Sequence, residues 1–329
     1  MTARYDVAGL GNAIVDVIAA VDDEFLLEHH IAKGVMTLVD EFRAQQLYRT
    51  LPRPQEIAGG SAANTMAGLA ALGGKGLFVG KTKEDRLGAT FADSLRTIGV
   101  AFETKMAADG PATACSLIVV TPDGHRSMNT YLGASRELDR SDIDEIEIAA
   151  AQVLYVEGYL WDAPEAKAAI NKAIRITKRA DRKVAFTLSD PFCVARWREE
   201  FRELLSNIDI LFANEEEAKA LFEASDFDAV LQSLRTWPGI AALTRSEKGC
   251  VIAHQNDIHV IDAVPVDRVI DTTGAGDQFA AGFLYGITHG NGLGDSGRLG
   301  ALAASEVISH FGARPGQSLA RMAEAAGLL

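Results

Sequence analysis

The stretch DTTGAGDQFAAGFLYG, residues 271–286, places three small residues and a carboxylate directly before an apolar run. Glycines at 274 and 276 allow a sharp turn and close approach of the backbone to a ligand. At a helix start, the N–H groups of Gly274, Ala275 and Gly276 would form an anion site. We interpret Asp277 as a general base that takes a hydroxyl proton while these N–H groups hold a transferring phosphoryl group. The alternative is that Asp277 only caps the helix.

Short β-like runs alternate with amphipathic helical stretches along the chain. The expected strands are DVAGLG, GLFVG, VLYVEG, KVAFTL, DILFAN and IAALT. The expected helices are SAANTMAGLAALG, RLGATFADSLRTIG, PEAKAAINKAIRITKRA, REEFRELLS and EEEAKALFEA. This order predicts an α/β fold with a mostly parallel central sheet and helices on both faces. Ligands bind such sheets at the carboxyl ends of the strands, where the glycine-rich turn is expected.

Two segments, about 13–40 and 112–132, interrupt this alternation because they lack long helices. The second segment contains two strand-like runs that flank the turn tripeptide PDG, which predicts a hairpin. We expect both segments to form a small additional β-sheet, interpreted as a lid. No low-complexity linker or internal repeat is present, so residues 1–329 are expected to form one domain that carries this lid.

The composition restricts the class of protein. The 329 residues are 48% hydrophobic, enough for a large core, and no run is apolar and long enough for a membrane span. Three cysteines without a CxxC pair suit a reducing cytoplasm and argue against a disulfide framework or a zinc site. The net charge of −13 makes nucleic acid an unfavourable partner, whereas a local group of N–H donors can still bind a small anion.

The complete string D-T-T-G-A-G-D-x-F-x-x-G resembles the second signature of the ribokinase family, the PfkB-type carbohydrate and nucleoside kinases. The resemblance implies that Asp277 is the catalytic base and that Gly274, Ala275 and Gly276 form the anion hole. The stretch AGGSAANTMAGLAALG resembles the first signature of the same family. The resemblance covers nearly the whole chain and implies a ribokinase-like fold that uses ATP and Mg²⁺.

Residues near the N-terminus are expected to bind the phosphoryl acceptor. In GLGNAIVDVIAAVDD, the resemblance assigns Asp16 to the substrate hydroxyls, with Asn12 as a helper. A carboxylate that accepts two hydroxyl protons is a suitable ribose clamp. Gly59 and Gly60 would let the substrate lie against the backbone, and Asn64 offers both a donor and an acceptor. Without the second signature, these residues would be read as an ordinary glycine-rich turn with a buried Asn.

A dinucleotide-binding interpretation of GLGNAI fails. The fingerprint G-x-G-x-x-G requires a third glycine, and Ile14 occupies that position. A dehydrogenase is therefore a weak alternative, since the expected phosphate loop is at the other end of the chain.

Two further segments resemble the ATP-binding elements of the family. ANEEEAKAL matches the N-x-x-E element with Asn214 and Glu217, which implies a Mg²⁺ site that Glu217 reaches through water. LTRSEKG resembles the nucleotide-binding T-x-G-x-x-G turn. Thr244 and Gly249 are retained, whereas Ser246 replaces the middle glycine.

The resemblance also implies a monovalent cation, expected to be K⁺, beside the anion hole. Asp271, Thr273 and Gly312 occupy the matching positions. From the residues alone, Asp271 is equally consistent with a turn residue that bonds its own backbone.

The hairpin 112–132 carries two candidate site residues. Arg126 could reach the transferring phosphoryl group and neutralise its charge, although most arginines are simply solvated. Met128 could line an apolar slot for a nucleobase, and Tyr159 and Trp161 could stack on the base. For the two aromatic side chains, ordinary packing is the favoured alternative.

Within the family, GNAIVDVIA, GGSAANT, EGYLWD and TLSDPFC are similar to bacterial adenosine kinases. This similarity implies ATP-dependent phosphorylation of the 5′-hydroxyl of adenosine, a reaction of purine salvage. The alternatives are a kinase for ribose, fructose or another nucleoside, and a catalytically inactive ligand-binding protein on the same fold. A small molecule is the expected partner, and both a monomer and a homodimer are consistent with the sequence.

Overall fold

The computed structural model describes residues 3–329, and its centre is a nine-stranded sheet. Its strands have the order β14-β13-β12-β11-β10-β9-β1-β5-β6. All neighbours from β12 to β6 are parallel, and β13 and β14 add an antiparallel edge. The bounds are β1 Tyr5–Leu10, β5 Gly76–Val79, β6 Ala101–Phe102, β9 Ala151–Glu157, β10 Lys183–Thr187, β11 Ile210–Asn214, β12 Ile240–Thr244, β13 Cys250–His254 and β14 Asp257–Ile261.

Side-chain alternation along the central strands builds a core on each face of this sheet. In β9, Leu154 and Val156 belong to one apolar cluster, and Val153 and Tyr155 to the other. Successive strand residues point to opposite faces, so a strand buried on both faces is apolar throughout. The first cluster packs under α5 Glu145–Ala149, α6 Pro164–Arg179, α7 Pro191–Leu204, α8 Glu215–Phe222 and α9 Phe227–Leu234. The second packs under α3 Ser61–Ala71, α4 Arg86–Thr97, α10 Ala275–Thr288 and α11 Leu293–Val307.

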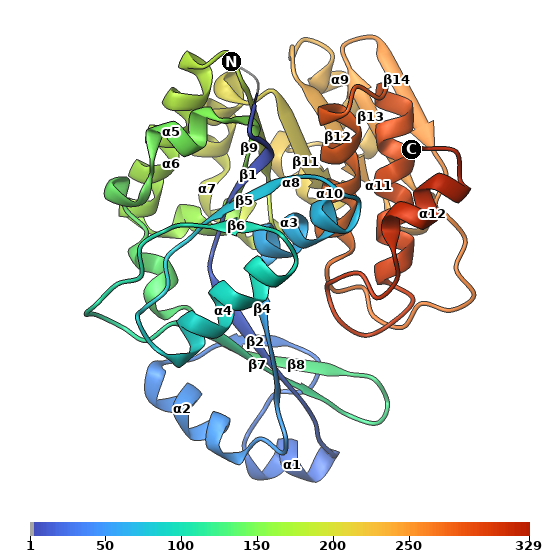
Figure 1. The fold of residues 1–329 in the computed structure, drawn as a ribbon. Coiled ribbons are helices and arrows are strands. Elements are labelled where there is room, and N and C mark those ends of the chain that lie inside the picture. The colour runs from blue at the N-terminus through green and yellow to red at the C-terminus, as the bar shows by residue number, and fades with distance from the viewer. Residues whose placement is uncertain (1–2) are drawn as a thin grey trace.

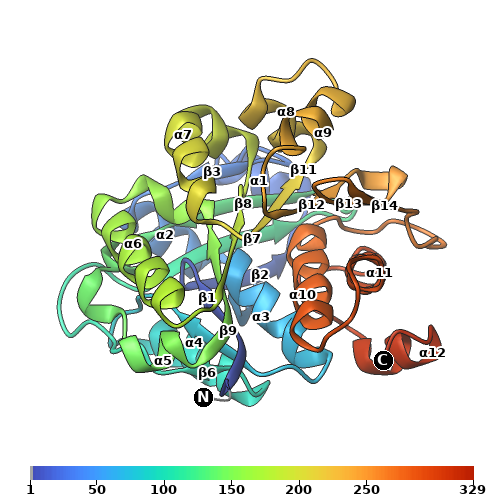
Figure 2. The ribbon, with the colours of Figure 1, turned by 90° about the horizontal axis from the view of Figure 1, so that it is seen from above.

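The view from above shows these two helical layers on either side of the sheet (Figure 2). The last helix, α12 Leu319–Ala325, packs against α11. The six strands and five helices expected from the sequence are all present, and the predicted α/β fold is confirmed. The edge strands β6, β13 and β14 were not predicted.

A smaller, five-stranded sheet lies at one end of the molecule with two short helices, α1 Asp23–Glu28 and α2 Glu41–Thr50 (Figure 1). Its order is β3-β8-β7-β2-β4. The segments 13–40 and 112–132 supply four strands, β2 Ile14–Ala20, β3 Met36–Leu38, β7 Ala114–Val120 and β8 Arg126–Tyr131. The fifth strand, β4 Gln55–Gly59, lies outside both segments and pairs with β2.

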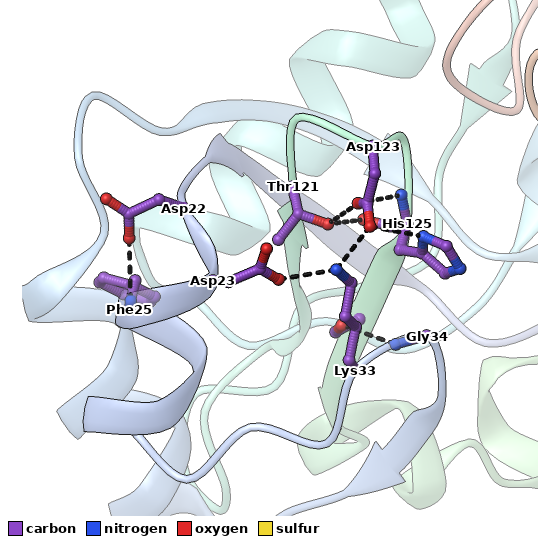
Figure 3. Close-up of polar contacts among 9 residues, drawn as sticks. Asp22, Asp23, Phe25, Lys33, Gly34, Thr121, Asp123 and His125 are labelled. Carbon is purple, nitrogen blue, oxygen red and sulfur yellow. Dashed lines mark hydrogen bonds and ion pairs between the residues drawn. The ribbon is translucent and has the colours of Figure 1, made fainter.

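The expected hairpin joins β7 and β8, and its turn is tied to α1. Thr121 and His125 close the turn, in which Gly124 has a φ of +85°. Figure 3 shows Lys33 between two carboxylates, with its Nζ 2.6 Å from an oxygen of Asp23 and 2.6 Å from an oxygen of Asp123. The outer end of the smaller sheet is therefore held together by charge as well as by strand pairing.

Cys115, Cys193 and Cys250 are buried free thiols. Across residues 3–329, none of the helices combines the length and the apolar character that a membrane crossing requires.

Candidate active site

The glycine-rich turn leads directly into α10. Gly274 precedes the helix with a φ of +80°, and a Cβ there would lie 2.7 Å from the Cα of Ala313. Gly276 faces open space, so the absence of a side chain leaves its backbone accessible. The N–H of Ala275 bonds the Thr272 carbonyl at 3.2 Å, which removes one of the three expected anion donors. In the described chain, the N–H groups of Gly274 and Gly276 donate no hydrogen bond and can receive an anion.

Asp277 lies in the first turn of α10, and its carboxylate faces α3. It accepts hydrogen bonds from the Ser61 hydroxyl at 2.6 Å and from the Asn64 side-chain amide at 3.2 Å. Among residues 3–329, no side chain caps the N-terminus of α10, so the helix-cap alternative for Asp277 does not apply. Burial raises the pKa of Asp277 to about 6, against the opposing effect of these two hydrogen bonds. Such a carboxylate is ionised at neutral pH and still basic enough to accept a proton.

Asp16 and the paired glycines meet where β2 lies beside β4. A Cβ on Gly59 would be 2.3 Å from the Asp16 carboxylate, and one on Gly60 would be 2.4 Å from the Asn12 carbonyl oxygen. Burial raises the pKa of Asp16 to about 6, Arg126 and Arg314 oppose that shift, and the charge of Asp277 adds to it. The charge of Asp277 therefore acts on the Asp16 carboxylate, and the two carboxylates belong to one site.

Glu157 lies at the end of β9 and accepts hydrogen bonds from Asn12. The sequence did not predict this residue as part of the site. One Glu157 oxygen accepts from the Asn12 backbone N–H and from its side-chain amide, both at 2.7 Å. The other accepts from the backbone N–H of Ala62 at 2.9 Å. Glu157 is 1% exposed, and burial raises its pKa to about 7. A lone carboxylate that ends an apolar strand, as in VLYVE, is the signal that could have identified it.

Arg126 of β8 reaches across to Asp271 and forms a buried ion pair with it. Asp271 also accepts from the Thr273 N–H at 3.0 Å, the Thr273 hydroxyl at 2.6 Å and the Gly312 N–H at 3.0 Å. Burial raises the pKa of Asp271, but these bonds and Arg126 hold it below its usual value. Asp271, Thr273 and Gly312 do lie together. Thr273 and Gly312, however, direct hydrogen-bond donors at the Asp271 carboxylate. The Asp271 carboxylate, already paired with Arg126, is therefore not free to hold a monovalent cation.

Asn214 and Glu217 form a capping box at the start of α8. The Asn214 side chain accepts from the Glu217 N–H, and the two oxygens of Glu217 accept from the Asn214 backbone and side-chain amides at 2.9 and 2.7 Å. Burial raises the pKa of Glu217 to about 7. Residues 3–329 contain no group of three or more His, Cys, Asp or Glu that could hold a metal. A Mg²⁺ ion that keeps most of its waters and binds nucleotide phosphates fits Glu217 through water, and not as a direct ligand.

The expected nucleotide turn follows β12. Thr244 ends that strand, and Ser246 adopts a φ of +52°, in the left-handed region that favours glycine. A Cβ on Gly249 would be 2.0 Å from the Ile261 carbonyl oxygen. Ser246 therefore keeps the backbone shape for which the family uses glycine.

Of the two aromatic candidates, Tyr159 lines a cavity and Trp161 belongs to the core. Tyr159 is 38% exposed and lines a small cavity with Asn12, Leu132 and Arg136. Trp161 is 4% exposed and packs edge-on against Phe186 and Phe201, so the packing alternative holds for it. Half-buried Met128 pairs with Ile118 and Met36 within the smaller sheet.

Known proteins resemble the chain over most of its length. The pfkB family carbohydrate kinase model matches residues 35–319. The structure of a probable sugar kinase protein from Rhizobium etli is 47% identical with a TM-score of 0.91, and the match covers 100% of both chains. That of the adenosine kinase from Sinorhizobium meliloti is 49% identical with a TM-score of 0.90, covering 98% of this chain and 100% of that one. The adenosine kinase of Saccharomyces cerevisiae is 26% identical over 92% of this chain and 94% of its own. The chain belongs to the pfkB family of carbohydrate kinases.

Proposed function

We propose that this pfkB-family kinase transfers the γ-phosphoryl group of ATP to the 5′-hydroxyl of adenosine, giving AMP and ADP in purine salvage. The observation that carries the proposal is Asp277, a carboxylate with a raised pKa beside the unpaired N–H groups of Gly274 and Gly276. The likeness to an adenosine kinase over almost the whole chain supports adenosine as the acceptor. The cytoplasm is the proposed location of the reaction.

In the proposed reaction, Asp277 accepts the proton of the 5′-hydroxyl while the hydroxyl oxygen forms a bond to the γ-phosphorus. The bond from the γ-phosphorus to the β–γ bridging oxygen breaks, and its electron pair leaves with ADP. The N–H groups of Gly274 and Gly276 hold charge on the transferring group, and Arg126 adds a positive charge from β8. Ser61 and Asn64 orient the Asp277 carboxylate for this step.

Residues around β2, β4 and α3 would hold the acceptor. Asp16 and Asn64 bond its sugar hydroxyls, and Gly59 and Gly60 leave room for the sugar against the backbone. Met128 and Tyr159 would border the base. The smaller sheet would act as a lid over this site, since the buried pair of Arg126 with Asp271 already joins it to the glycine-rich turn.

ATP and Mg²⁺ use is implied by membership of the family. Thr244, Ser246 and Gly249 would hold the nucleotide, and Asn214 with Glu217 would order water around the Mg²⁺. When bound, Mg²⁺ neutralises charge on the phosphates.

A sugar kinase is the second candidate, because a structure 47% identical to this chain is described as a probable sugar kinase. The Asp277 mechanism is the same for both candidates, since any acceptor hydroxyl can supply the proton. The two candidate functions differ only in the part of the acceptor that extends beyond the sugar. An inactive binding protein is disfavoured because Asp277 and the glycine-rich turn are both intact.

The test is ADP release from ATP, Mg²⁺ and purified protein with adenosine, inosine, guanosine, ribose or fructose, with and without K⁺. Turnover with adenosine well above the other acceptors is expected. Turnover with ribose or fructose alone would replace adenosine by a sugar. No turnover with any acceptor, while ATP still binds, would support the inactive alternative.

A further inference from the structure

Arg314 follows the two residues that close the glycine-rich turn, and its position is fixed on several sides. Gly312 donates to Asp271, and the Ala313 carbonyl accepts from the Gln278 side-chain amide at 2.9 Å. The Nη1 of Arg314 lies 3.3 Å from the Ser94 hydroxyl, which also accepts from the Ala58 N–H at 3.2 Å. Ser94 therefore links Arg314 to Ala58 of β4, the residue before Gly59.

This position brings Arg314 close to Asp16, because a Cβ on Gly59 would touch the Asp16 carboxylate. The charges of the two residues act on each other: Asp16 opposes the lowering of the Arg314 pKa to about 10 by burial. Yet among residues 3–329 no ion pair joins them, and the Asp16 carboxylate accepts no hydrogen bond. The Nε and Nη2 atoms of Arg314 are buried and have no partner among the described residues.

A buried donor without an acceptor is costly, so both nitrogens are expected to gain a partner in the working protein. The partner must accept from a guanidinium and donate to a carboxylate. A hydroxyl group does both, whereas a phosphate oxygen would be repelled by Asp16. The Oδ1 of Asn64, also buried without a partner in residues 3–329, is a further acceptor for a hydroxyl of the bound sugar.

We propose that Arg314 is a specificity-determining residue that donates to the oxygen of an acceptor hydroxyl whose proton bonds Asp16. This inference rests on the proposed function, because Arg314 would recognise one of the sugar hydroxyls of the acceptor. A sugar that lacks that hydroxyl leaves the guanidinium and the carboxylate without their shared partner. Arg314 thus adds discrimination against deoxy acceptors to the binding supplied by Asp16.

The experiment measures equilibrium binding of adenosine, 2′-deoxyadenosine and 3′-deoxyadenosine by calorimetry, without ATP, to wild type and Arg314→Met. Loss of a charge-assisted hydrogen bond is expected to weaken adenosine binding roughly tenfold to a hundredfold. Binding of one of the two deoxy forms should change by less than about threefold, because that form never made the bond. Arg314→Lys should restore part of the discrimination, and Ser94→Ala should lose a smaller part. Arg321→Met, on the exposed face of α12, is the charge-matched control and should behave as wild type.

Equal losses for all three nucleosides would show that Arg314 only supports the local structure and would overturn the proposal. Weaker binding of ATP by Arg314→Met in a separate titration, with unchanged adenosine binding, would overturn it in favour of a phosphate contact. Wild-type turnover, measured separately, tests the proposed function. If the wild type prefers ribose, the same comparison is made with ribose and 2-deoxyribose, so failure of the adenosine assignment stays distinct from failure of Arg314.

Discussion

At the scale of single residues, two carboxylates with pKa values raised to about 6 face one site from different sheets. Asp277 lies in the first turn of α10, beside the large sheet, and Asp16 lies in the smaller sheet; the charge of Asp277 raises the pKa of Asp16. Each has to be ionised for its proposed task, Asp277 to take a proton and Asp16 to accept hydroxyl hydrogen bonds. Both carboxyl groups therefore lose their protons over the same range of pH.

The first prediction concerns the pH dependence of kcat/KM, which reports the groups of the free enzyme. Both pKa values are raised, so activity is lost as the pH falls through about 6 and is complete above about 7. Below pH 6, the slope of log kcat/KM against pH should approach about two, because two protons must leave. Steady-state rates with adenosine between pH 5 and pH 8 provide the measurement.

Two variants separate the contributions to that profile. Asp16→Asn should reduce the limiting slope to about one, because a single titrating carboxylate remains. Ser61→Ala should move the Asp277 midpoint upward, because the Ser61 hydroxyl lowers that pKa. A rate that is constant from pH 5 to pH 8, or a downward shift in Ser61→Ala, would contradict the assignment.

At the scale of elements, Glu157 joins the end of β9, the loop after β1 and the start of α3. Three N–H groups converge on its two oxygens. Since α3 carries Ser61 and Asn64, the position of this helix also sets the orientation of the Asp277 carboxylate. A buried residue that contacts no reacting atom thereby helps to position the proposed base.

The second prediction is that Glu157→Ala lowers the free energy of unfolding by at least about 2 kcal/mol, because it orphans three buried donors. Glu157→Gln, which keeps an acceptor for the Asn12 donors, should cost less than half as much. Urea unfolding of the three proteins at pH 7 measures both effects. Equal stability of Glu157→Ala and wild type would show that the three donors are satisfied in another way.

The elements also show which features the sequence could predict. Strands such as β9 and β11 have apolar interiors, and Gly274 directly precedes α10, so periodicity and turn chemistry were sufficient. The strand β4 follows two prolines and has only five residues, and its ladder depends on β2, a tertiary partner that local pattern does not reveal. Glu157 and Arg314 were missed for the same reason, because their importance comes from groups distant in sequence. The family motif singled out Asp271, but only the structure pairs it with Arg126.

At the scale of the whole molecule, burial raises the pKa of four carboxyl groups to about 6 or 7. They are Asp16, Glu157, Glu217 and Asp277. A raised pKa means that the folded state holds protons that the unfolded chain has released above about pH 4. The stability contributed by these groups is present at low pH and is lost as the pH rises toward 7.

The third prediction is therefore a fall in unfolding free energy of at least about 2 kcal/mol between pH 5 and pH 8. Urea titrations at a series of pH values, without ligand, measure it. Carboxylates with lowered pKa values, such as Glu56, do not oppose this trend, because their contribution is complete above about pH 5. Asp277→Asn should flatten the dependence by removing one titrating group. A stability that is constant or rises toward pH 8 would show that these groups are ionised at little cost.

The most direct test of the central claim, that Asp277 is the base of an adenosine kinase, is turnover of adenosine by wild type and Asp277→Asn at pH 8. The account predicts a loss of roughly 10² to 10⁴-fold in kcat, the usual contribution of a positioned general base. ATP binding and cooperative unfolding should be retained, since Asn keeps the shape of the side chain and can still meet Ser61. Turnover of Asp277→Asn close to that of the wild type would contradict the claim.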